Sequence, residues 1–415
     1  MDKMSSYDRY KRIRDKLNYT YKGYNLKNLI PGYLNFLFDD LTPSLRDVIK
    51  AFYVSRTILD LRKVFCIQSP TLITYLINRT DYKNLAYAAK SFYYDSDVVN
   101  LSELPTIKKP FISFSYVGYL LKASRIVFSR SLGLPMRSKL YLSAILINLF
   151  YQINLLEKLK PVKNINRYIC FNSAYKEECM LTTFFNKQGI ETITLQHGIF
   201  CNYKSFVPFD YINFDNFIAA KMLCWGQSTI DYLTANGIDK SRLMLVGNLK
   251  YKNLKIDKIN QNMGKCLVLL GRGLYVDTNN KLLEILTDYN KQHDPGVIFY
   301  IKKHPFLMDE EHKQFADISN NIIFLGREYS VEETLKSSLV DFSIAVNTTA
   351  YYESLALGKP CLRWTESENE EFFGMDDKFD SLEGLKEKIM ALKTADESVV
   401  RKEMQDVIKY IFNPS

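Results

Sequence analysis

Phosphate-binding chemistry is concentrated in two short stretches of the sequence. The first is the turn formed by Asn347, Thr348 and Thr349, which follows an apolar run and precedes a helical pattern that ends before Gly358. A strand that passes directly into a helix at two hydroxyl side chains predicts an anion site. The first-turn amides of a helix lack intrahelical acceptors, and the helix dipole favours negative charge there. Glu353 follows about one turn later, where its carboxylate can accept hydrogen bonds from a ribose.

The second stretch lies about forty residues upstream. An apolar strand is predicted at Val297–Ile301, and Lys302, Lys303, His304 and Pro305 follow it. The lysines supply positive charge, and the histidine supplies a hydrogen-bond donor near neutral pH. Ligands of parallel α/β sheets bind outside the carboxyl ends of the strands. The two stretches together therefore predict a site for a nucleotide diphosphate or a monophosphate ester.

A third candidate is His197, which follows a predicted strand at Thr192–Gln196 and precedes Gly198. The glycine permits a sharp turn, so the imidazole is expected to face the ligand. Such a histidine can remove a proton from an acceptor hydroxyl or bind a phosphoryl oxygen as a cation. A purely structural role is the alternative. The other two histidines, His293 and His312, lie in charged, helix-like surroundings and are predicted to be on the surface.

A weaker signal is the loop of Gly271, Arg272 and Gly273, which follows a predicted strand at Cys266–Leu270. One guanidinium in a flexible loop can clamp a phosphate, but a simple turn explains the same residues equally well. The sequence has no DxD triplet and no His, Cys or carboxylate cluster with ligand spacing. We therefore predict no metal and no other cofactor.

The elements that must position these residues alternate between strand and helix from Arg167 onward. The preceding part is predicted to be mainly helical, with patterns such as Ser44–Val64 at three- and four-residue spacings. A polar stretch at 250–264 predicts a domain boundary. The predicted organisation is an N-terminal domain at 1–250, helical over 1–160 and Rossmann-like over 165–250, then a nucleotide-binding Rossmann-like domain at 265–395 and a C-terminal helix at 396–415.

Length and composition agree with a two-domain α/β enzyme. The chain has 415 residues, more than one core usually supports, and 47% of them are hydrophobic. The longest apolar runs, such as Leu142–Tyr151, fall short of the roughly 20 residues of a membrane helix. No secretory leader is recognisable, and the seven cysteines are scattered without a CxxC pair. These features predict a cytoplasmic protein with reduced cysteines.

The net charge of +9 is concentrated in one segment. Leu101–Cys170 holds eleven Lys or Arg residues but only Glu103 and Glu157 as acids. An amphipathic-looking stretch at Leu140–Leu155 accompanies this surplus, so the segment is expected to contact an anionic membrane surface. No nucleic-acid motif accompanies the charge, and nucleic acid is not a predicted partner. A solvated basic face without a ligand is the alternative.

The motifs resemble those of the bacterial GT-B glycosyltransferases that build capsules and lipopolysaccharide. The resemblance rests on QHG after a strand, KKHP, and a Thr-containing turn followed by YESLALGKP, and it covers Arg167–Pro360. The group includes Kdo transferases of capsule assembly, bacterial sialyl- and polysialyltransferases and, more distantly, teichoic-acid glycerophosphotransferases. The resemblance implies two Rossmann-like domains facing across a cleft, with the donor held mainly by the second domain, and the helix-rich N-terminal part of the predicted fold lies outside it.

The resemblance also implies roles for residues. His304, Thr348 and Thr349 would hold the donor phosphate, and Glu353 would lie near the ribose. Sialyltransferase-like members carry an acidic motif at the strand end where this chain has QHG. A carboxylate base is therefore not carried over, and His197 is expected to be the base or to orient the acceptor.

The predicted function is metal-independent transfer of a sugar from a nucleotide sugar to a hydroxyl of a bacterial surface glycan, free or lipid-linked. The resemblance slightly favours CMP-linked Kdo or sialic acid over a UDP-sugar. The predicted catalytic residues are His197 and His304. Two alternatives remain: transfer of glycerol or ribitol phosphate from a CDP-alditol, and a non-catalytic glycan-binding subunit of an assembly complex. The expected location is the cytoplasm, at the inner face of the plasma membrane.

Overall fold

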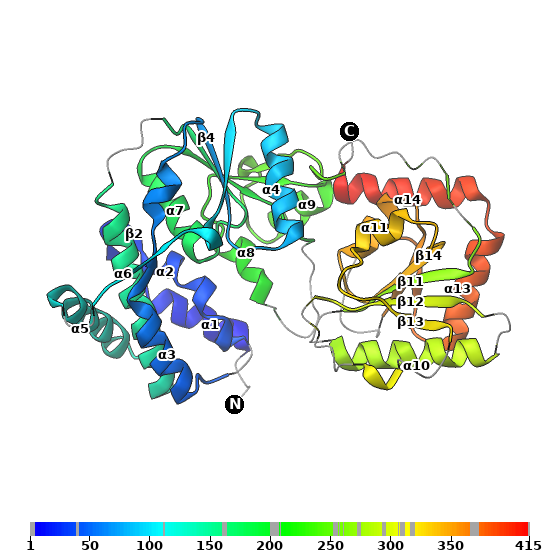
Figure 1. Cartoon of the computed structure of the whole chain (residues 1–415), viewed down its shortest axis with the longest axis horizontal. Coiled ribbons are helices and arrows are strands. Elements are labelled where there is room, and N and C mark those ends of the chain that lie inside the picture. Colours follow the sequence, from blue (N-terminus) through cyan, green and yellow to red (C-terminus); the bar gives the residue numbers. More distant parts are fainter. Residues whose placement is uncertain are drawn as a thin grey trace. The chain divides into compact units, whose positions relative to one another are not determined.

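The fold was examined in a computed structural model of the chain (Figure 1). The structure describes residues 5–38, 41–110, 113–159, 164–199, 207, 209–251, 256, 258–259, 261–271, 275–292, 296–305, 307, 312–315, 320–365 and 373–413. The chain divides into two compact units. Unit 1 comprises 1–197, 206–224 and 233–244, and unit 2 comprises 198–205, 225–232 and 245–415.

Unit 1 is built on a six-stranded sheet in the order β10-β9-β8-β7-β4-β5. From β9 to β5 the neighbouring strands pair in parallel. The strands are β4 (Thr71–Tyr75), β5 (Ser96–Asn100), β7 (Arg167–Cys170), β8 (Glu191–Leu195), β9 (Lys221–Cys224) and β10 (Leu243–Leu245). Two small antiparallel pairs join β1 (Thr20–Tyr21) to β2 (Tyr24–Asn25) and β3 (Thr57–Leu59) to β6 (Thr106–Lys108).

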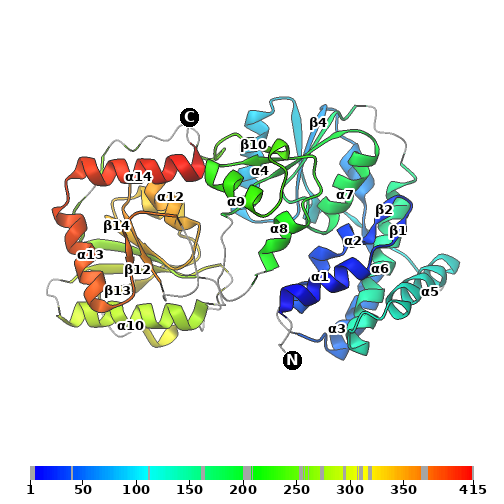
Figure 2. The ribbon, with the colours of Figure 1, turned by 180° about the vertical axis from the view of Figure 1, so that it is seen from behind.

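Helices surround this sheet, and three of them form a group in which α3 and α5 both pack on α6 (Figures 1 and 2). The helices are α1 (Ser6–Lys16), α2 (Leu26–Leu29), α3 (Leu45–Ser55), α4 (Thr80–Phe92), α5 (Phe114–Ser129), α6 (Met136–Leu156), α7 (Lys176–Lys187), α8 (Ile212–Asp215) and α9 (Gln227–Ala235). The first residues of α9 belong to unit 2.

Two expectations about the first 160 residues were wrong. This part is not only helical, because it supplies β4 and β5 to the sheet, and β4 pairs directly with β7. The amphipathic-looking stretch within α6 does not face outward, because most of its side chains are buried in the unit 1 core. Among the described residues α6 alone is long and apolar enough to cross a membrane, but 67% of its most apolar window is buried within the protein.

Unit 2 contains the second six-stranded sheet, in the order β13-β12-β11-β14-β15-β16, and every neighbouring pair is parallel. The strands are β11 (Lys265–Leu269), β12 (Ile298–Lys302), β13 (Ile322–Phe324), β14 (Phe342–Ala345), β15 (Cys361–Trp364) and β16 (Lys378–Phe379). The helices are α10 (Val276–Gln292), α11 (Val331–Lys336), α12 (Ala350–Ala356), α13 (Leu382–Thr394) and α14 (Glu397–Phe412).

Successive side chains of β11 point to opposite faces of this sheet, as strand geometry requires. Cys266 and Val268 join a core with α10 and α13, whereas Leu267 and Leu269 join a core with α12 and α14. The sheet is therefore covered on both faces (Figures 1 and 2). Parallel strands flanked by helices in both units confirm the prediction of an α/β protein with two Rossmann-like parts and a helix-rich N-terminal region.

The helix α14 belongs to the unit 2 core rather than standing apart from it. Its last aromatic residue, Phe412, packs on Trp225 with 5.6 Å between ring centroids. The Phe412 carbonyl also accepts a hydrogen bond of 2.7 Å from the backbone N–H of Asn248. A Cβ at Gly226 would lie 2.3 Å from the carbonyl oxygen of Ile411, so only glycine fits this close approach. These contacts place 225–232 in unit 2.

Candidate functional site

The ends of three neighbouring strands bring the two predicted phosphate-binding stretches to one edge of the unit 2 sheet. The central strand β11 pairs Leu269 with Lys302 of β12 and with Ala345 of β14. His304 and Asn347 each lie two residues beyond these partners. Two strand spacings separate β12 from β14, which is about 10 Å. That distance is within the span of a nucleotide, so one ligand can contact both strand ends.

The backbone after β14 turns sharply at Asn347, whose φ of 40° lies in the left-handed region. Asparagine tolerates this conformation better than most residues. Its side-chain amide donates a hydrogen bond to the Tyr275 hydroxyl, just before α10. Gly271 lies against the same wall, because a Cβ there would be 3.1 Å from the Val346 carbonyl oxygen. The ends of β11 and β14 are thus held together by contacts specific to these residues.

Gly271 is also fixed by a reciprocal pair of hydrogen bonds with the buried Asn279 of α10. The Gly271 N–H donates to Asn279 Oδ1 at 2.9 Å, and Asn279 Nδ2 donates to the Gly271 carbonyl at 3.0 Å. This anchor shows that the strand end is ordered rather than loose. The remaining members of the predicted glycine loop, Arg272 and Gly273, lie outside the described residues.

The expected anion site at the start of α12 differs from the structure in its physical basis. The Ala350 N–H donates to Thr348 Oγ1 at 3.3 Å, and the N–H groups of Tyr351 and Tyr352 donate to the carbonyls of Thr348 and Thr349. These amides are therefore already bonded within the turn. In addition, α12 has only seven residues, which limits its dipole. These three amides are therefore not open to an anion, and side chains of the turn would have to replace them as donors.

The basic residues at the end of β12 have different contacts. Lys302 Nζ donates to the Gly326 carbonyl at 2.7 Å, and burial lowers the Lys302 pKa while Glu328 acts to raise it. Lys303 Nζ lies 5.5 Å from the centroid of the Phe324 ring. His304 is half-buried, and its carbonyl accepts a hydrogen bond from the Leu307 N–H at 2.9 Å. Lys302 therefore ties β12 to the segment after β13. Lys303 and His304 are half-buried, as Lys302 is, and Pro305 is exposed.

Glu353 has a cationic neighbour that the sequence did not suggest. Lys250 Nζ lies 3.7 Å from Glu353 Oε1 and 2.8 Å from Glu332 Oε2. Burial acts to lower the Lys250 pKa, but these carboxylates outweigh it and raise the pKa. The three residues join the segment before β11 to α11 and α12. A ribose that binds Glu353 would have to share it with Lys250.

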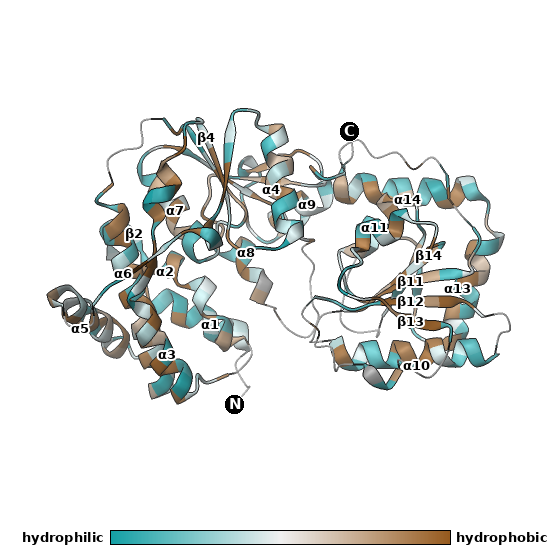
Figure 3. Cartoon of the chain, in the orientation of Figure 1, coloured by the Kyte–Doolittle hydropathy of each residue, from teal (hydrophilic) through white to brown (hydrophobic). Residues whose placement is uncertain are grey.

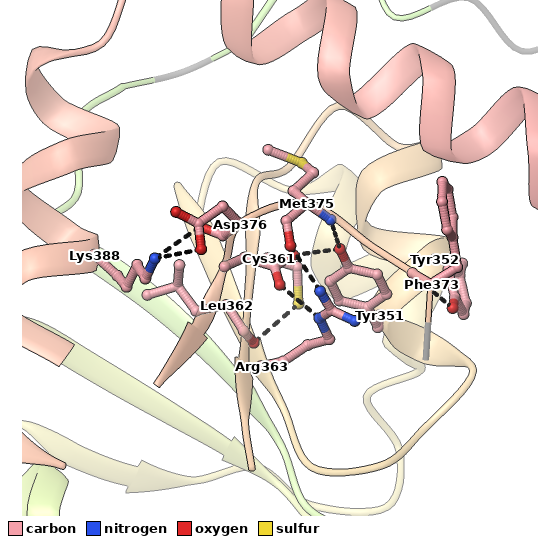
Figure 4. Close-up of polar contacts among 10 residues, drawn as sticks. Tyr351, Tyr352, Cys361, Leu362, Arg363, Phe373, Met375, Asp376 and Lys388 are labelled. Atoms are coloured by element: carbon pink, nitrogen blue, oxygen red, sulfur yellow. Dashed lines mark hydrogen bonds and ion pairs between the residues drawn. The ribbon is translucent and has the colours of Figure 1, made fainter. Parts of the chain in front are cut away.

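A buried ion pair holds α12 against the segment that follows β15 (Figure 4). Arg363 Nε donates to Asp377 Oδ1 at 2.5 Å, and the Tyr351 hydroxyl donates to the other oxygen of that carboxylate. Arg363 also donates to the Met375 carbonyl at 2.8 Å, and the Met375 N–H donates to the Tyr351 hydroxyl at 3.2 Å. Because Tyr351 is the second residue of α12, this network fixes the helix directly after Thr349.

The third candidate, His197, lies in unit 1 two residues beyond the carboxyl end of β8, whose neighbouring strands are β7 and β9. Its ring contacts Phe171, with 4.8 Å between centroids, and Phe171 in turn stacks on Tyr82 of α4 at 3.9 Å. The Arg79 guanidinium covers the Tyr82 ring at 4.8 Å. An aromatic layer therefore supports the half-buried imidazole from one side.

A chain of two buried asparagines leads to the Nε2 atom of His197. The Ala174 N–H can only donate, and it donates to Asn172 Oδ1 at 3.0 Å. Asn172 Nδ2 then donates to Asn213 Oδ1 at 2.9 Å, which leaves Asn213 Nδ2 toward His197 Nε2 at 3.4 Å. An Asn213 amide in this orientation donates to Nε2, which favours the neutral tautomer with its proton on Nδ1.

A buried carboxyl group supports the same strand end. Glu178 of α7 accepts hydrogen bonds from the Phe171 N–H at 2.8 Å, the Asn172 N–H at 3.1 Å and the Thr74 hydroxyl at 2.8 Å. Burial raises the pKa of Glu178 to about 8, although these hydrogen bonds act to lower it. Glu178 thereby fixes the β7 end on which His197 rests.

Sequence reasoning missed Asn172, Asn213 and Glu178, because no spacing relates an asparagine to a histidine that it meets only in the fold. The prediction that His312 lies on the surface was wrong. His312 is buried, and its Nδ1 lies 2.8 Å from Asn280 Oδ1. His293 lies outside the described residues. Within the described parts of the chain, no group of three or more His, Cys, Asp or Glu residues is placed to hold a metal ion.

No protein-family model matches the chain, and no curated protein matches it. The chain is similar to the solved structure of UDP-GlcNAc 2-epimerase from Methanocaldococcus jannaschii in complex with UDP-GlcNAc and UDP, with a TM-score of 0.48, 14% identity, and coverage of 79% of this chain and 94% of that one. It is similar to a co-structure of MnaA from S. aureus with UDP, with a TM-score of 0.49, 11% identity, and coverage of 82% and 92%.

A third similar structure is the apo form of the lipopolysaccharide outer core galactosyltransferase WaaB. Here the TM-score is 0.43 and the identity 11%, and the match covers 82% of this chain and 95% of that one. Similarities at this level do not decide the reaction, the ligand or the site. The fold assignment rests on the two parallel sheets described above.

Proposed function

We propose that the protein is a glycosyltransferase that transfers a sugar from a nucleotide sugar to a hydroxyl of a bacterial surface glycan. The observation that supports this most is that His304 and Asn347 follow β12 and β14 at the same position in the sheet register, on either side of β11. One ligand can therefore contact both the basic end of β12 and the threonine-containing turn after β14. Parallel α/β sheets bind nucleotides at this edge. The aligned stretches are also those on which the resemblance to capsule and lipopolysaccharide glycosyltransferases rests.

In this proposal the leaving nucleotide phosphate is stabilised by side chains of unit 2. His304 and Lys303 supply hydrogen-bond donors and positive charge, and the hydroxyls of Thr348 and Thr349 supply further donors. Donors fixed in advance where charge develops commonly contribute about 10²–10³-fold each to the rate. The Arg363–Asp377 pair helps fix them, since it holds α12 directly after the threonine turn.

On unit 1, His197 orients the acceptor hydroxyl in this proposal, rather than removing its proton through Nε2. The contact from Asn213 to that nitrogen supports the choice. The donor sugar that the sequence motifs favour is CMP-linked Kdo or sialic acid, and a UDP-sugar is the competing donor. The acceptor is a glycan or a lipid-linked glycan at the cytoplasmic face of the membrane.

A ligand panel and a product assay test the proposal. Ligands that bind only the folded state raise the melting temperature, so CMP, CDP, UDP and GDP conjugates are compared at equal concentration. We expect a nucleotide sugar to stabilise the protein, and this stabilisation to be lost in His304→Ala. Product analysis then distinguishes a new glycosidic bond from the phosphodiester that CDP-alditol transfer would form. No shift with any nucleotide sugar, or a phosphodiester product, would contradict the proposal.

A further inference from the structure

Unit 1 exposes an unusual number of large apolar side chains on one helix. Along α5 they recur at three- and four-residue spacings, so they form a single stripe. Tyr116, Ala123, Ile126 and Val127 occupy the opposite side and are buried against the unit. The stripe consists of Phe114, Val117, Leu121 and Phe128, and Phe114 and Leu121 are 101% and 67% exposed. Figure 3 shows the hydropathy along α5.

A second exposed stripe lies on α3. Leu45, Ile49 and Tyr53 recur at four-residue spacing and are each more than half exposed. Both helices pack on α6, so the two stripes belong to the same helical group (Figures 1 and 2). Lys139 of α6 lies over the Phe128 ring at 5.6 Å, and Met136 at the start of α6 is 61% exposed. Lys139 thus links the first turns of α6 to the stripe of α5.

The charge along α5 and α6 has one sign, whereas the α3 stripe carries the exposed Asp47 beside Arg46 and Lys50. From Leu104 to Leu156 the chain contains seven Lys or Arg residues and no Asp or Glu residue. Arg125 lies within the α5 stripe and is exposed, and Arg137 is exposed beside Met136. A surface that combines protruding aromatic and aliphatic side chains with uncompensated positive charge has the composition of membrane-surface helices.

We infer that the stripe of α5, together with the exposed residues of α3 and the start of α6, is a docking surface for a membrane of anionic phospholipid. The positive charge selects this occupant. A second copy of the chain would bring the same positive surplus against itself, and a nucleic acid would leave the aliphatic side chains of Val117 and Leu121 without a matching partner. Lipid headgroups supply the opposite charge, and the acyl boundary accepts the apolar side chains. The inference agrees with the proposed membrane-linked acceptor but does not require it.

Vesicle sedimentation of the full chain tests the inference. We expect binding to vesicles that contain phosphatidylglycerol, weaker binding to phosphatidylcholine alone, and release as salt screens the charges. In the double variant Phe114→Ser, Leu121→Ser, the affinity for vesicles should fall about tenfold for each apolar side chain that no longer inserts into the bilayer. The matched control is Met390→Ser, Val399→Ser, which replaces two exposed apolar residues of unit 2.

The outcomes separate this surface from the proposed activity. Unchanged vesicle binding by the α5 double variant, or equal binding to both lipid compositions, would overturn the inference. Dimerisation abolished by the same variant would assign the stripe to a second copy instead. If the protein bound RNA, and if neither variant bound vesicles more weakly than the wild type, the positive charge would be assigned to nucleic acid. The double variant should transfer sugar to a water-soluble acceptor at the wild-type rate. A loss of that transfer would mean that the substitutions damage the enzyme itself, not only its docking to the membrane. Arg125→Glu is a second variant, which changes the charge of the surface and leaves its apolar side chains intact.

Discussion

Lys302 and Ala345 lie at the same level of the unit 2 sheet, because each pairs with Leu269 of the strand between them. The register therefore aligns two segments that are separated by more than forty residues in the sequence. His304 and Thr348 follow these partners by two and three residues, so both belong to the same edge. This alignment is the structural basis for treating the two stretches as one site.

The imidazole of His304 should be essential for transfer. His304→Ala removes a donor for the leaving phosphate, and we expect the rate of transfer to fall about 10²–10³-fold. His304→Gln retains one neutral donor and should recover part of the loss if hydrogen bonding matters more than charge. The measurement is kcat/KM for the donor, with circular dichroism to check the fold. Wild-type kinetics in His304→Ala would remove the donor-site assignment.

The proton position on His197 should depend on Asn213. In the wild-type protein we expect a neutral ring protonated at Nδ1, and in Asn213→Asp a ring protonated at Nε2, because a carboxylate can only accept there. Nitrogen chemical shifts of ¹⁵N-labelled histidine distinguish these forms, and His197→Gln assigns the signal among four histidines. Asn164→Asp, an exposed amide of the same unit, is the control. A wild-type ring protonated at Nε2 would contradict the asparagine relay.

The Arg363–Asp377 pair should be far more important for stability than the neighbouring exposed pair (Figure 4). Asp377→Asn leaves a buried guanidinium without its counter-charge, which costs about 3–5 kcal/mol. Lys388→Ala breaks a pair whose carboxylate, Asp376, is 98% exposed, and should cost below about 1 kcal/mol. Both tryptophans, Trp225 and Trp364, belong to unit 2, so their fluorescence follows its unfolding. Equal effects of the two variants would contradict the assignment.

The buried Glu178 should make unit 1 less stable as the pH rises. Its pKa is about 8 in the folded protein against 4.5 ordinarily, so between these values the folded state keeps a proton that the unfolded state has lost. The stabilisation is therefore complete below about pH 4.5, declines through this window at about 1.4 kcal/mol per pH unit at most, and levels off above pH 8. Hydrogen exchange of β7 and α7 measures it. Glu178→Gln should lack this component, and an identical pH dependence in that variant would exclude Glu178 as its source.

Transfer should not require a divalent metal. In the proposed site the charge on the leaving phosphate is balanced by Lys303, His304 and the threonine hydroxyls, so EDTA should leave the rate largely unchanged. The assay compares enzyme before and after chelation, with and without added Mg²⁺ or Mn²⁺. A strict requirement for either ion would show that side chains alone do not stabilise the leaving group.

The sequence predicted β11, β12 and β14 of the second sheet for a simple physical reason, but it did not predict β15 or β16. Strands such as Phe342–Ala345 are buried on both faces, so each appears as a short apolar run between polar turns. The same reasoning failed for β5, where SDVVN carries polar residues at both ends and is only partly buried. It also failed for α6, where it predicted an amphipathic surface stretch. A helix that is covered by two neighbouring helices is apolar on most sides and has no extended polar face.

The polar contacts of the site could not be predicted from spacing. Asn172 and Asn213 are forty-one residues apart and meet only because the fold brings the segment after β7 to α8. Lys250 was assigned to a linker, yet it binds the carboxylate of Glu353 in the fold. The amides before Tyr352 looked available as an anion site, but the tight turn after Asn347 provides them with acceptors. Such contacts depend on local geometry that residue types alone do not determine.

The packing of Phe412 on Trp225 has a consequence for how the protein is made. A ribosome releases Trp225 well before it has synthesised α14, so unit 2 cannot complete its core until nearly two hundred further residues have emerged. During that interval the face of Trp225 that packs on Phe412 lacks this partner, and a chaperone that bound there would have to leave before α14 could dock.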